Sequence, residues 1–153
     1  MLIYFGIGSN IGERDANLRN AIELLQERVG ECIACSSIYR SAPQGFVSEN
    51  EFANMVVLCE TSHSLEDILT ITQQIEREMG REKKSINGIY HDRIIDIDLL
   101  KAYDYLPFTS HLSSLTYESS TLILPHPRMH ERDFVMIPFR EVEQLYCTLK
   151  GRK

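Results

Sequence analysis

Residues 93–100 hold two aspartates inside an otherwise apolar run, Arg-Ile-Ile-Asp-Ile-Asp-Leu-Leu. Isoleucine and leucine favour a β-strand here, in which side chains two positions apart project from the same face. Asp96 and Asp98 should therefore point the same way, with their α-carbons about 6.6 Å apart. A run that is apolar on both faces is typical of a central strand, so the chain must build a sheet around it.

Two carboxylates on one face of a covered strand need a partner. Like charges are costly to bury unless they are paired or bound to a metal, and hard oxygen ligands favour magnesium over zinc. Arg93 and the basic stretch before it add cations that a triphosphate would also require. The solvent face of an ordinary half-buried strand has the same alternation, and this alternative stays open on the pattern alone. We favour a magnesium site.

Length and charge narrow the class of protein. A chain of 153 residues with 43% hydrophobic and 25% charged residues is typical of one globular domain, which we expect to span residues 1–153. The formal net charge of −6 argues against nucleic-acid partners and anionic membrane surfaces. No basic leader precedes the apolar N-terminal run, and no stretch reaches transmembrane length, so we expect a cytoplasmic protein.

The positions of the four cysteines do not indicate a disulfide framework. Cys32 and Cys35 fall in a strand-like run and should face opposite sides of it, which disfavours both a redox pair and a zinc knuckle. Cys59 and Cys147 are isolated in the sequence. Free thiols in a reducing compartment are the expected state.

Apolar periodicity predicts a succession of strands and helices. Strands are expected at residues 2–8, 33–39, 52–58, 93–100 and 122–124, with helices at about 18–29 and 65–79, the second capped by Ser64. Residues 103–121 suggest a hairpin or irregular excursion, and a last buried segment begins at Phe134. The connection from Tyr39 to Phe52 is too short for a helical crossover and implies antiparallel strands. These elements predict an α+β fold, a ferredoxin-like βαββαβ core with additional strands in an antiparallel sheet packed by helices.

Several polar or glycine-rich segments are candidates for ligand contact. The turn at residues 8–12 lacks the lysine of a P-loop and misses the Rossmann spacing by one residue. His126 and His130 are four apart, but Pro127 between them argues against a zinc helix, so they and the nearby arginines are better anion donors. Phe52 and Asn54 share a strand face and could hold a flat heterocycle. Gln73 and Glu76 are expected on the exposed flank of their helix.

Three separated motifs together resemble one family. They are Gly8-Ser9-Asn10, Arg93-x-x-Asp96-x-Asp98, and Pro125-His126 followed by Arg132-x-Phe134. In this order, with Tyr39-Arg40-x-x-Pro43 and Phe52-x-Asn54 between them, they resemble 6-hydroxymethyl-7,8-dihydropterin pyrophosphokinases, the folate-pathway transferases that move pyrophosphate from ATP to a pterin alcohol and release AMP.

The resemblance implies a role for each matched residue. Asp96 and Asp98 would hold two Mg²⁺ ions that bridge the phosphates of the co-substrate ATP. The residues implied to close over the phosphates or assist transfer are Arg81, Lys83 and Arg93. The residues implied to contact ATP are Gln73, Glu76, Lys84, His126 and Arg132. The residues implied to bind the pterin are Ala42, Pro43, Gly45, Phe52, Asn54 and Phe134. No nucleic acid or membrane is implied as a partner, and we expect a monomer.

Two alternative functions are open. One follows from departures of this chain from the family's motifs, and the other follows from motifs shared in part with a different class of enzyme. The family often carries Trp-Gly-Pro before Arg93, where this chain has Tyr-His-Asp, and Lys83 lies near a position that is often arginine. A catalytically silent pterin- or nucleotide-binding module is therefore one alternative. The other is a nucleotidyltransferase that uses the Asp-x-Asp strand, although its Gly-Ser turn would lie much closer to the aspartates in sequence.

Overall fold

A computed structural model of the chain describes residues 1–41, 51–80, 94–105, 109 and 111–151. The strands are β1 (Leu2–Ser9), β2 (Glu31–Cys35), β3 (Tyr39–Ser41), β4 (Phe52–Glu60), β5 (Asp96–Tyr105), β6 (Leu112–Ser114), β7 (Tyr117–Glu118) and β8 (Ile123–Leu124). The helices are α1 (Arg14–Arg28), α2 (Leu65–Glu78), the short 3₁₀ helix η1 (Met129–Glu131) and α3 (Asp133–Gly151). Among these residues, no helix is both long and apolar enough to span a bilayer.

The main sheet has β1 at its centre. Its order is β2-β4-β1-β5-β6, with β3 also paired to β4, and every pairing is antiparallel. The elements β1-α1-β2-β4-α2-β5 are the predicted βαββαβ core, and their strand order is that of the ferredoxin-like arrangement. The expected α+β fold is confirmed.

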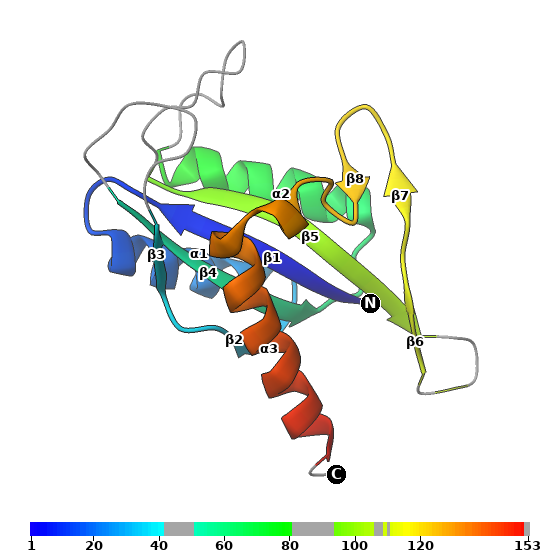
Figure 1. The fold of residues 1–153 in the computed structure, drawn as a ribbon. Coiled ribbons are helices and arrows are strands. Elements are labelled where there is room, and N and C mark those ends of the chain that lie inside the picture. The colour runs from blue at the N-terminus through cyan, green and yellow to red at the C-terminus, as the bar shows by residue number, and fades with distance from the viewer. Residues whose placement is uncertain (42–50, 81–93, 106–108, 110, 152–153) are drawn as a thin grey trace.

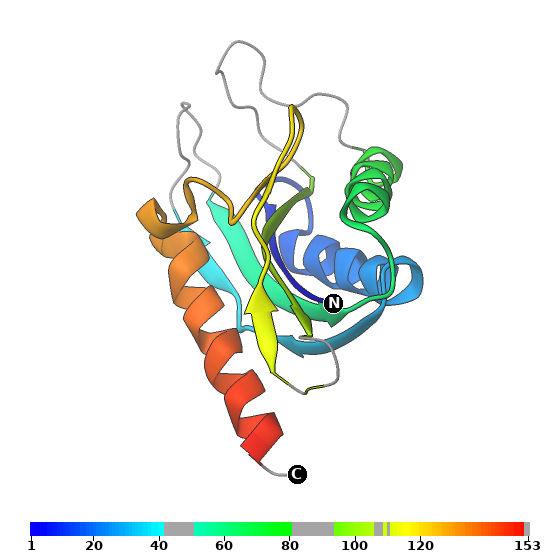
Figure 2. The same cartoon turned by 90° about the vertical axis from the view of Figure 1, so that its right-hand side faces the viewer.

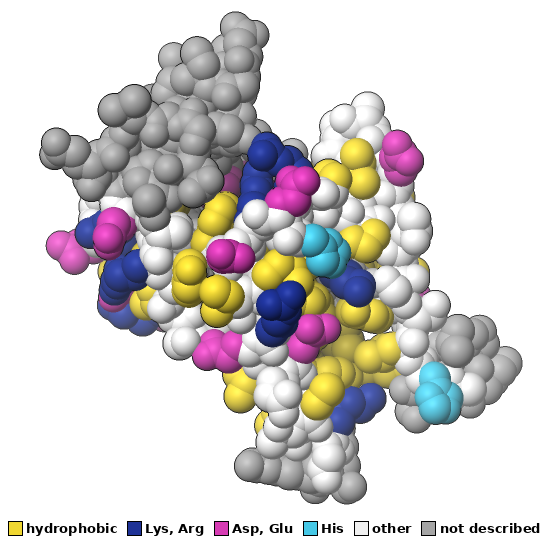
Figure 3. Space-filling view, in the orientation of Figure 1, with side chains coloured by type: hydrophobic (Ala, Val, Ile, Leu, Met, Phe, Trp, Pro, Cys, Tyr) yellow, Lys and Arg dark blue, Asp and Glu magenta, His cyan; other side chains and the backbone are white. Residues whose placement is uncertain are grey.

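Helices cover both faces of this sheet. Figures 1 and 2 show α1 and α2 on one side and α3 crossing the other. Alternate residues of β1 serve the two layers: Ile3, Phe5 and Ile7 pack in the cluster that includes α1 and α2, whereas Leu2 and Tyr4 pack with α3. By the same alternation, Gly6 and Gly8 face the α3 side. Figure 3 looks onto that side and shows hydrophobic side chains gathered beside α3, with charged side chains of both signs among them.

The strand predicted at residues 33–39 is two short strands. Ser36 interrupts it, because its hydroxyl oxygen accepts a hydrogen bond from the Val56 backbone N–H at 3.0 Å and takes the place of a strand carbonyl. The next residue, Ser37, turns toward α3 and donates its N–H and hydroxyl to the carboxylate of Glu141. Side-chain acceptors of this kind compete with the regular ladder, and a propensity argument does not detect them.

The expectation that Cys32 and Cys35 face opposite sides was wrong. The register between β2 and β4 shifts between Cys32 and Ala34, so one extra residue enters the strand there. A bulge of one residue reverses the alternation beyond it. Cys35 therefore lies opposite Val57 and Cys32 opposite Cys59, two residues that belong to the same core layer.

The last buried segment, expected to begin at Phe134, belongs to one 19-residue helix, α3. Pro138 lies inside it and disfavours a helix in the sequence, because proline removes an internal hydrogen bond. Burial of Val135, Met136, Phe139 and Val142 against the sheet offsets that cost. Elsewhere the Ser64 cap accepts from the Asp67 N–H as predicted, and residues 112–114 form the expected hairpin partner of β5.

Candidate functional site

Asp96 and Asp98 begin β5 and lie on the α3 side of the sheet. In the register with β1, Asp96 is opposite Gly8 and Asp98 is opposite Gly6. Directly opposed residues of antiparallel strands share a face, so both carboxylates belong to the face of Gly6 and Gly8. Each aspartate is half-buried. The geometry thus agrees with the sequence prediction that the two carboxylates point the same way.

The central strand, β1, has two glycines, Gly6 and Gly8, that lie opposite candidate site residues of its neighbours. Gly8 is opposite Asn54 on β4 and also opposite Asp96 on β5, so these three residues form one row across the sheet. Because Gly8 lacks a side chain, no side chain of β1 stands between the amide and the carboxylate, although Gly8 itself is buried. A Cβ atom at Gly8 would lie 3.0 Å from the Asn54 Oδ1 atom.

Asn54 is held in one orientation by its own strand neighbours. Its Nδ2 donates to the Tyr39 carbonyl at 3.2 Å and to the Ser41 hydroxyl at 2.9 Å. With the amide nitrogen engaged on the β3 side, the carbonyl oxygen lies toward Gly8 and can accept a hydrogen bond there. Ser41 was not predicted as a site residue. Its contact with Asn54 depends on the pairing of β3 with β4, which no sequence pattern indicates.

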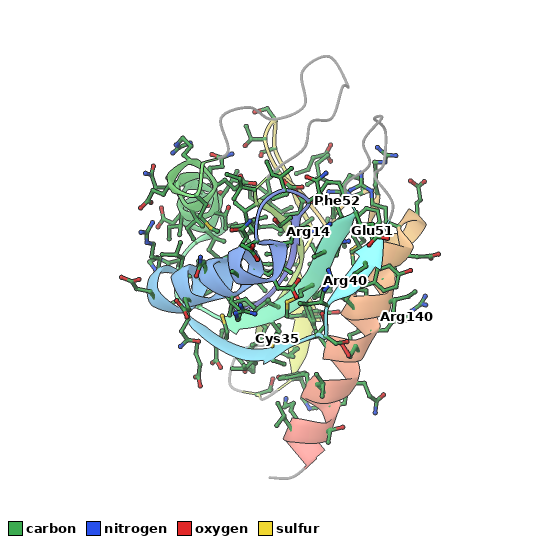
Figure 4. All side chains as sticks on the ribbon, turned by 90° about the vertical axis from the view of Figure 1, so that its left-hand side faces the viewer. Arg14, Cys35, Arg40, Glu51, Phe52 and Arg140 are labelled. Carbon is green, nitrogen blue, oxygen red and sulfur yellow. The ribbon has the colours of Figure 1, made fainter. Side chains whose placement is uncertain are left out.

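Phe52 begins β4 on the same side as Asn54. Figure 4 shows Phe52 at the end of the strand, next to Glu51 and Arg14. The guanidinium of Arg14 donates to the Glu51 carbonyl at 2.6 Å, which ties the start of β4 to α1. The ring of Phe52 contacts the Gly8 position, with its Cδ1 atom 3.6 Å from where a Cβ would be. An aromatic ring, an amide and a bare glycine therefore meet at one end of the sheet.

The segment after β8 brings His126 toward Asp96. The His126 N–H donates to the Leu100 carbonyl at 2.7 Å, and buried Met129 anchors the segment in the α3 core. Burial, then the positive charge of Arg132, lower the pKa of His126 below its usual value, while the charge of Asp96 opposes that shift. The shift favours the neutral form of His126 near pH 7. Its Nδ1 accepts from the Arg128 N–H at 3.2 Å, so the ring proton is on Nε2.

Arg132 and Phe134 stand at the start of α3. The guanidinium carbon of Arg132 lies 5.7 Å from the centroid of the Phe134 ring, within the range of a cation–π contact. His130, by contrast, is exposed on η1 and does not join His126 in a helical pair. Among the described residues, His126 thus lies within electrostatic range of Asp96, Arg128 and Arg132.

Glu76 lies beneath the aspartate strand, and the expectation that it is exposed was wrong. Its side chain is 2% exposed, and Oε2 accepts a hydrogen bond from the Ile97 N–H at 3.0 Å. Ile97 separates Asp96 from Asp98, so this bond fixes the strand between the two carboxylates. Gln73 is half-buried one helical turn earlier on α2. No sequence pattern distinguishes a glutamate that caps a strand edge from one on a solvent face.

Seven predicted site residues lie outside the described part of the chain: Ala42, Pro43, Gly45, Arg81, Lys83, Lys84 and Arg93. Within the described part, no set of three or more His, Cys, Asp or Glu side chains gathers at metal-binding distance.

Comparison with known proteins gives one family. The model of the family described as 7,8-dihydro-6-hydroxymethylpterin-pyrophosphokinase (HPPK) matches residues 4–144. The chain is 44% identical over 141 residues to the 2-amino-4-hydroxy-6-hydroxymethyldihydropteridine pyrophosphokinase of Porphyromonas gingivalis, a match covering 92% of this chain and 90% of that protein. It is 37% identical over 144 residues to the protein of the same name from Bacillus subtilis, covering 94% and 78%.

A solved structure described as HPPK-DHPS in complex with substrates has a similar fold. The TM-score is 0.58 at 14% sequence identity, and the match covers 89% of this chain. This chain spans 39% of that longer one. At so low an identity the likeness concerns the fold alone.

Proposed function

The chain belongs to the 7,8-dihydro-6-hydroxymethylpterin-pyrophosphokinase family, and on that basis we propose that it transfers pyrophosphate from ATP to 6-hydroxymethyl-7,8-dihydropterin, releasing AMP. The observation that carries the proposal is the row of Asn54, Gly8 and Asp96 across three strands. An amide suited to a heterocycle and a carboxylate suited to a metal stand on either side of a bare glycine. A reaction between a pterin and a metal-bound phosphate requires these two subsites to be neighbours.

The two aspartates fit Mg²⁺. They supply hard oxygen ligands from one face of a strand, and Mg²⁺ is commonly held by one or two carboxylates, with water and substrate phosphates completing its octahedron. We propose two ions, held by Asp96 and Asp98 together with ATP. When bound, they would neutralise charge that develops on the phosphate oxygens during transfer.

On the nucleotide side, Arg132 and His126 are the proposed contacts. Arg132 would offer a planar set of donors to a phosphate, and its stacking on Phe134 restricts where that set points. Neutral His126 would donate through Nε2 without adding charge. Gln73 and the cations at residues 81, 83, 84 and 93 remain proposed contacts from the resemblance.

On the pterin side, Asn54 and Phe52 are the proposed contacts, with Phe134 as a second ring. The orientation of the Asn54 amide supports an acceptor role toward a ring N–H, because its nitrogen already donates to Tyr39 and Ser41. Phe52 would supply apolar surface for one face of the heterocycle. Most of the catalysis would then come from holding the pterin alcohol and the β-phosphate in line.

Phosphorus NMR of the purified protein with ATP, Mg²⁺ and 6-hydroxymethyl-7,8-dihydropterin tests the proposal. We expect AMP and a pterin diphosphate ester to form together, and only when the pterin is present. Formation of ADP would contradict the site of cleavage. Release of free pyrophosphate with AMP retained on the product would favour the nucleotidyltransferase, and binding of both ligands without turnover would favour the silent module.

A substitution at Gly8 should weaken pterin binding selectively. In Gly8→Ala the new methyl would meet the Asn54 Oδ1 at 3.0 Å, and the amide cannot retreat without loosening its bonds to Tyr39 and Ser41. We expect KM for the pterin to rise about 10-fold, the equivalent of roughly one lost hydrogen bond, while KM for ATP changes little. Steady-state kinetics with each substrate varied in turn would measure both.

Gly6→Ala is the matched control for that experiment. Gly6 lies on the same strand and face, but a Cβ there would approach Leu100 methyl groups at 3.4 Å, close to an ordinary contact. The pterin KM of Gly6→Ala should stay within about twofold of the wild-type value. Equal losses in the two variants would point to general crowding of β1 and would contradict the assignment of Asn54.

We also propose that the chain acts as a single domain and a monomer in the cytoplasm. The sheet and its two helical layers engage described residues from 2 to 142 in two contiguous core clusters, which supports one domain. Sedimentation at micromolar concentration would test the monomer directly.

A further inference from the structure

Cys59 is isolated in the sequence, but the sheet places it directly opposite Cys32. The two residues are partners in the antiparallel register of β2 and β4, and their sulfur atoms are 3.1 Å apart. Opposed residues of antiparallel strands have α-carbons about 4.5 to 5.5 Å apart, which falls within the range that a disulfide spans. To form a disulfide, the two sulfur atoms must approach by about 1 Å, from 3.1 Å to the roughly 2.05 Å of an S–S bond.

The two thiols differ in access and in acidity. Cys59 is fully buried, whereas Cys32 is half-buried and lines an apolar hollow of about 360 Å³ with Ile22, Gln26 and Cys35. The hydrogen bond from the Cys59 thiol lowers the pKa of Cys32, and the same bond together with burial raises the pKa of Cys59. Cys32 is therefore the thiol that a small reagent can reach and the better thiolate of the two.

We propose that Cys32 and Cys59 form a thiol-modification site that low-molecular-weight disulfides convert to an internal disulfide. The Cys32 thiolate attacks one sulfur of the reagent, forming a mixed disulfide and releasing one reagent thiolate. Cys59 then attacks the Cys32 sulfur and passes its proton to the departing reagent thiolate, so that the Cys32–Cys59 bond forms as the bond from Cys32 to the reagent breaks. Two protein thiols are oxidised, and the reagent disulfide is reduced to two thiols.

The site is separate from the proposed catalytic one. Cys59 packs in the core layer of α1 and α2, whereas Asn54 on the same strand faces the α3 side. The crosslink would tie the edge strand β2 to β4 without touching the row of Asn54, Gly8 and Asp96. Detection of the crosslink needs no substrate. Absence of the crosslink could therefore be told apart from absence of the proposed pyrophosphokinase activity.

The test is to equilibrate the folded wild-type protein with oxidised glutathione and then to alkylate it under denaturing conditions. We expect peptide mapping to recover Cys32 joined to Cys59, while the exposed Cys35 and Cys147 stay free or carry glutathione, so that at most two of the four thiols remain free. Dithiothreitol should restore all four. Protein that is unfolded in urea before oxidation should instead give a mixture of pairings, because the register of β2 and β4 is lost.

Variants identify each step. Cys35→Ser removes the other thiol of the hollow and Cys147→Ser removes an exposed thiol, and both should still form the crosslink. Cys59→Ser should stop with glutathione attached to Cys32. The proposal is overturned if wild-type protein keeps four thiols, if glutathione stays on Cys32 while Cys59 remains reduced, or if the recovered crosslink joins other cysteines.

Discussion

Asp98→Asn should lower kcat by about 10³-fold and leave the fold intact, because the change removes one charged ligand of the proposed Mg²⁺ site. An asparagine at this position keeps the size of the side chain but offers a neutral oxygen to a hard cation. Asp98 is half-buried opposite Gly6, and asparagine has nearly the same volume, so the substitution opens no cavity. The free energy of unfolding should therefore change by less than about 1 kcal/mol. Turnover of ATP and pterin at saturating Mg²⁺ measures the first effect, and urea denaturation the second.

Asp104→Asn is the control for charge on the same strand. Asp104 is exposed near the far end of β5, and its Oδ1 accepts from the Tyr105 N–H at 2.9 Å, a bond that asparagine can also accept. We expect kcat within about twofold of wild type. A comparable kcat in Asp98→Asn would remove the basis for assigning metal binding to this pair of aspartates.

The order of elements could be predicted from the sequence because long apolar runs determine it. The alternation of Ile3, Phe5 and Ile7 and the stripe of α2 each point to one kind of element, and both were assigned correctly. The errors came where a single side chain or residue overrides the pattern. Ser36 ends a strand with its hydroxyl, and the bulge beside Ile33 turns Cys35 to the unexpected face. Such local exceptions depend on the partner strand, which the sequence does not reveal.

Parts of the candidate site could be predicted because their residues are close in sequence. Asp96 with Asp98, and Phe52 with Asn54, share a face by period-two geometry alone. The row that joins them depends on the register of three strands, and β1 contributes to it only by lacking side chains at Gly6 and Gly8. In a sequence, a glycine usually indicates a turn rather than a strand position without a side chain. The turn predicted to begin at Gly8 is in fact the end of β1.

Glu76→Ala should reduce both stability and turnover, because Glu76 holds the strand between the two aspartates. Loss of the carboxylate leaves the buried Ile97 N–H without this acceptor, which should lower the free energy of unfolding by about 2 to 3 kcal/mol. The released strand would carry Asp96 and Asp98 out of position, and a displacement on the order of 1 Å can cost about 10²-fold in kcat. Urea denaturation and steady-state kinetics on the same preparation measure the two losses.

Glu76→Gln separates the positioning role from a direct contact with ATP or its metal. The glutamine carbonyl can still accept from the Ile97 N–H, so the strand should stay in position and both stability and kcat should recover to within about 1 kcal/mol and threefold of wild type. Suppose instead that Glu76→Gln is stable but loses as much kcat as Glu76→Ala. The negative charge itself would then be required, and the contact with bound nucleotide implied by the family resemblance would replace the positioning role. If Glu76→Gln recovers both stability and kcat, and its KM for ATP is unchanged, then Glu76 acts through the backbone of β5.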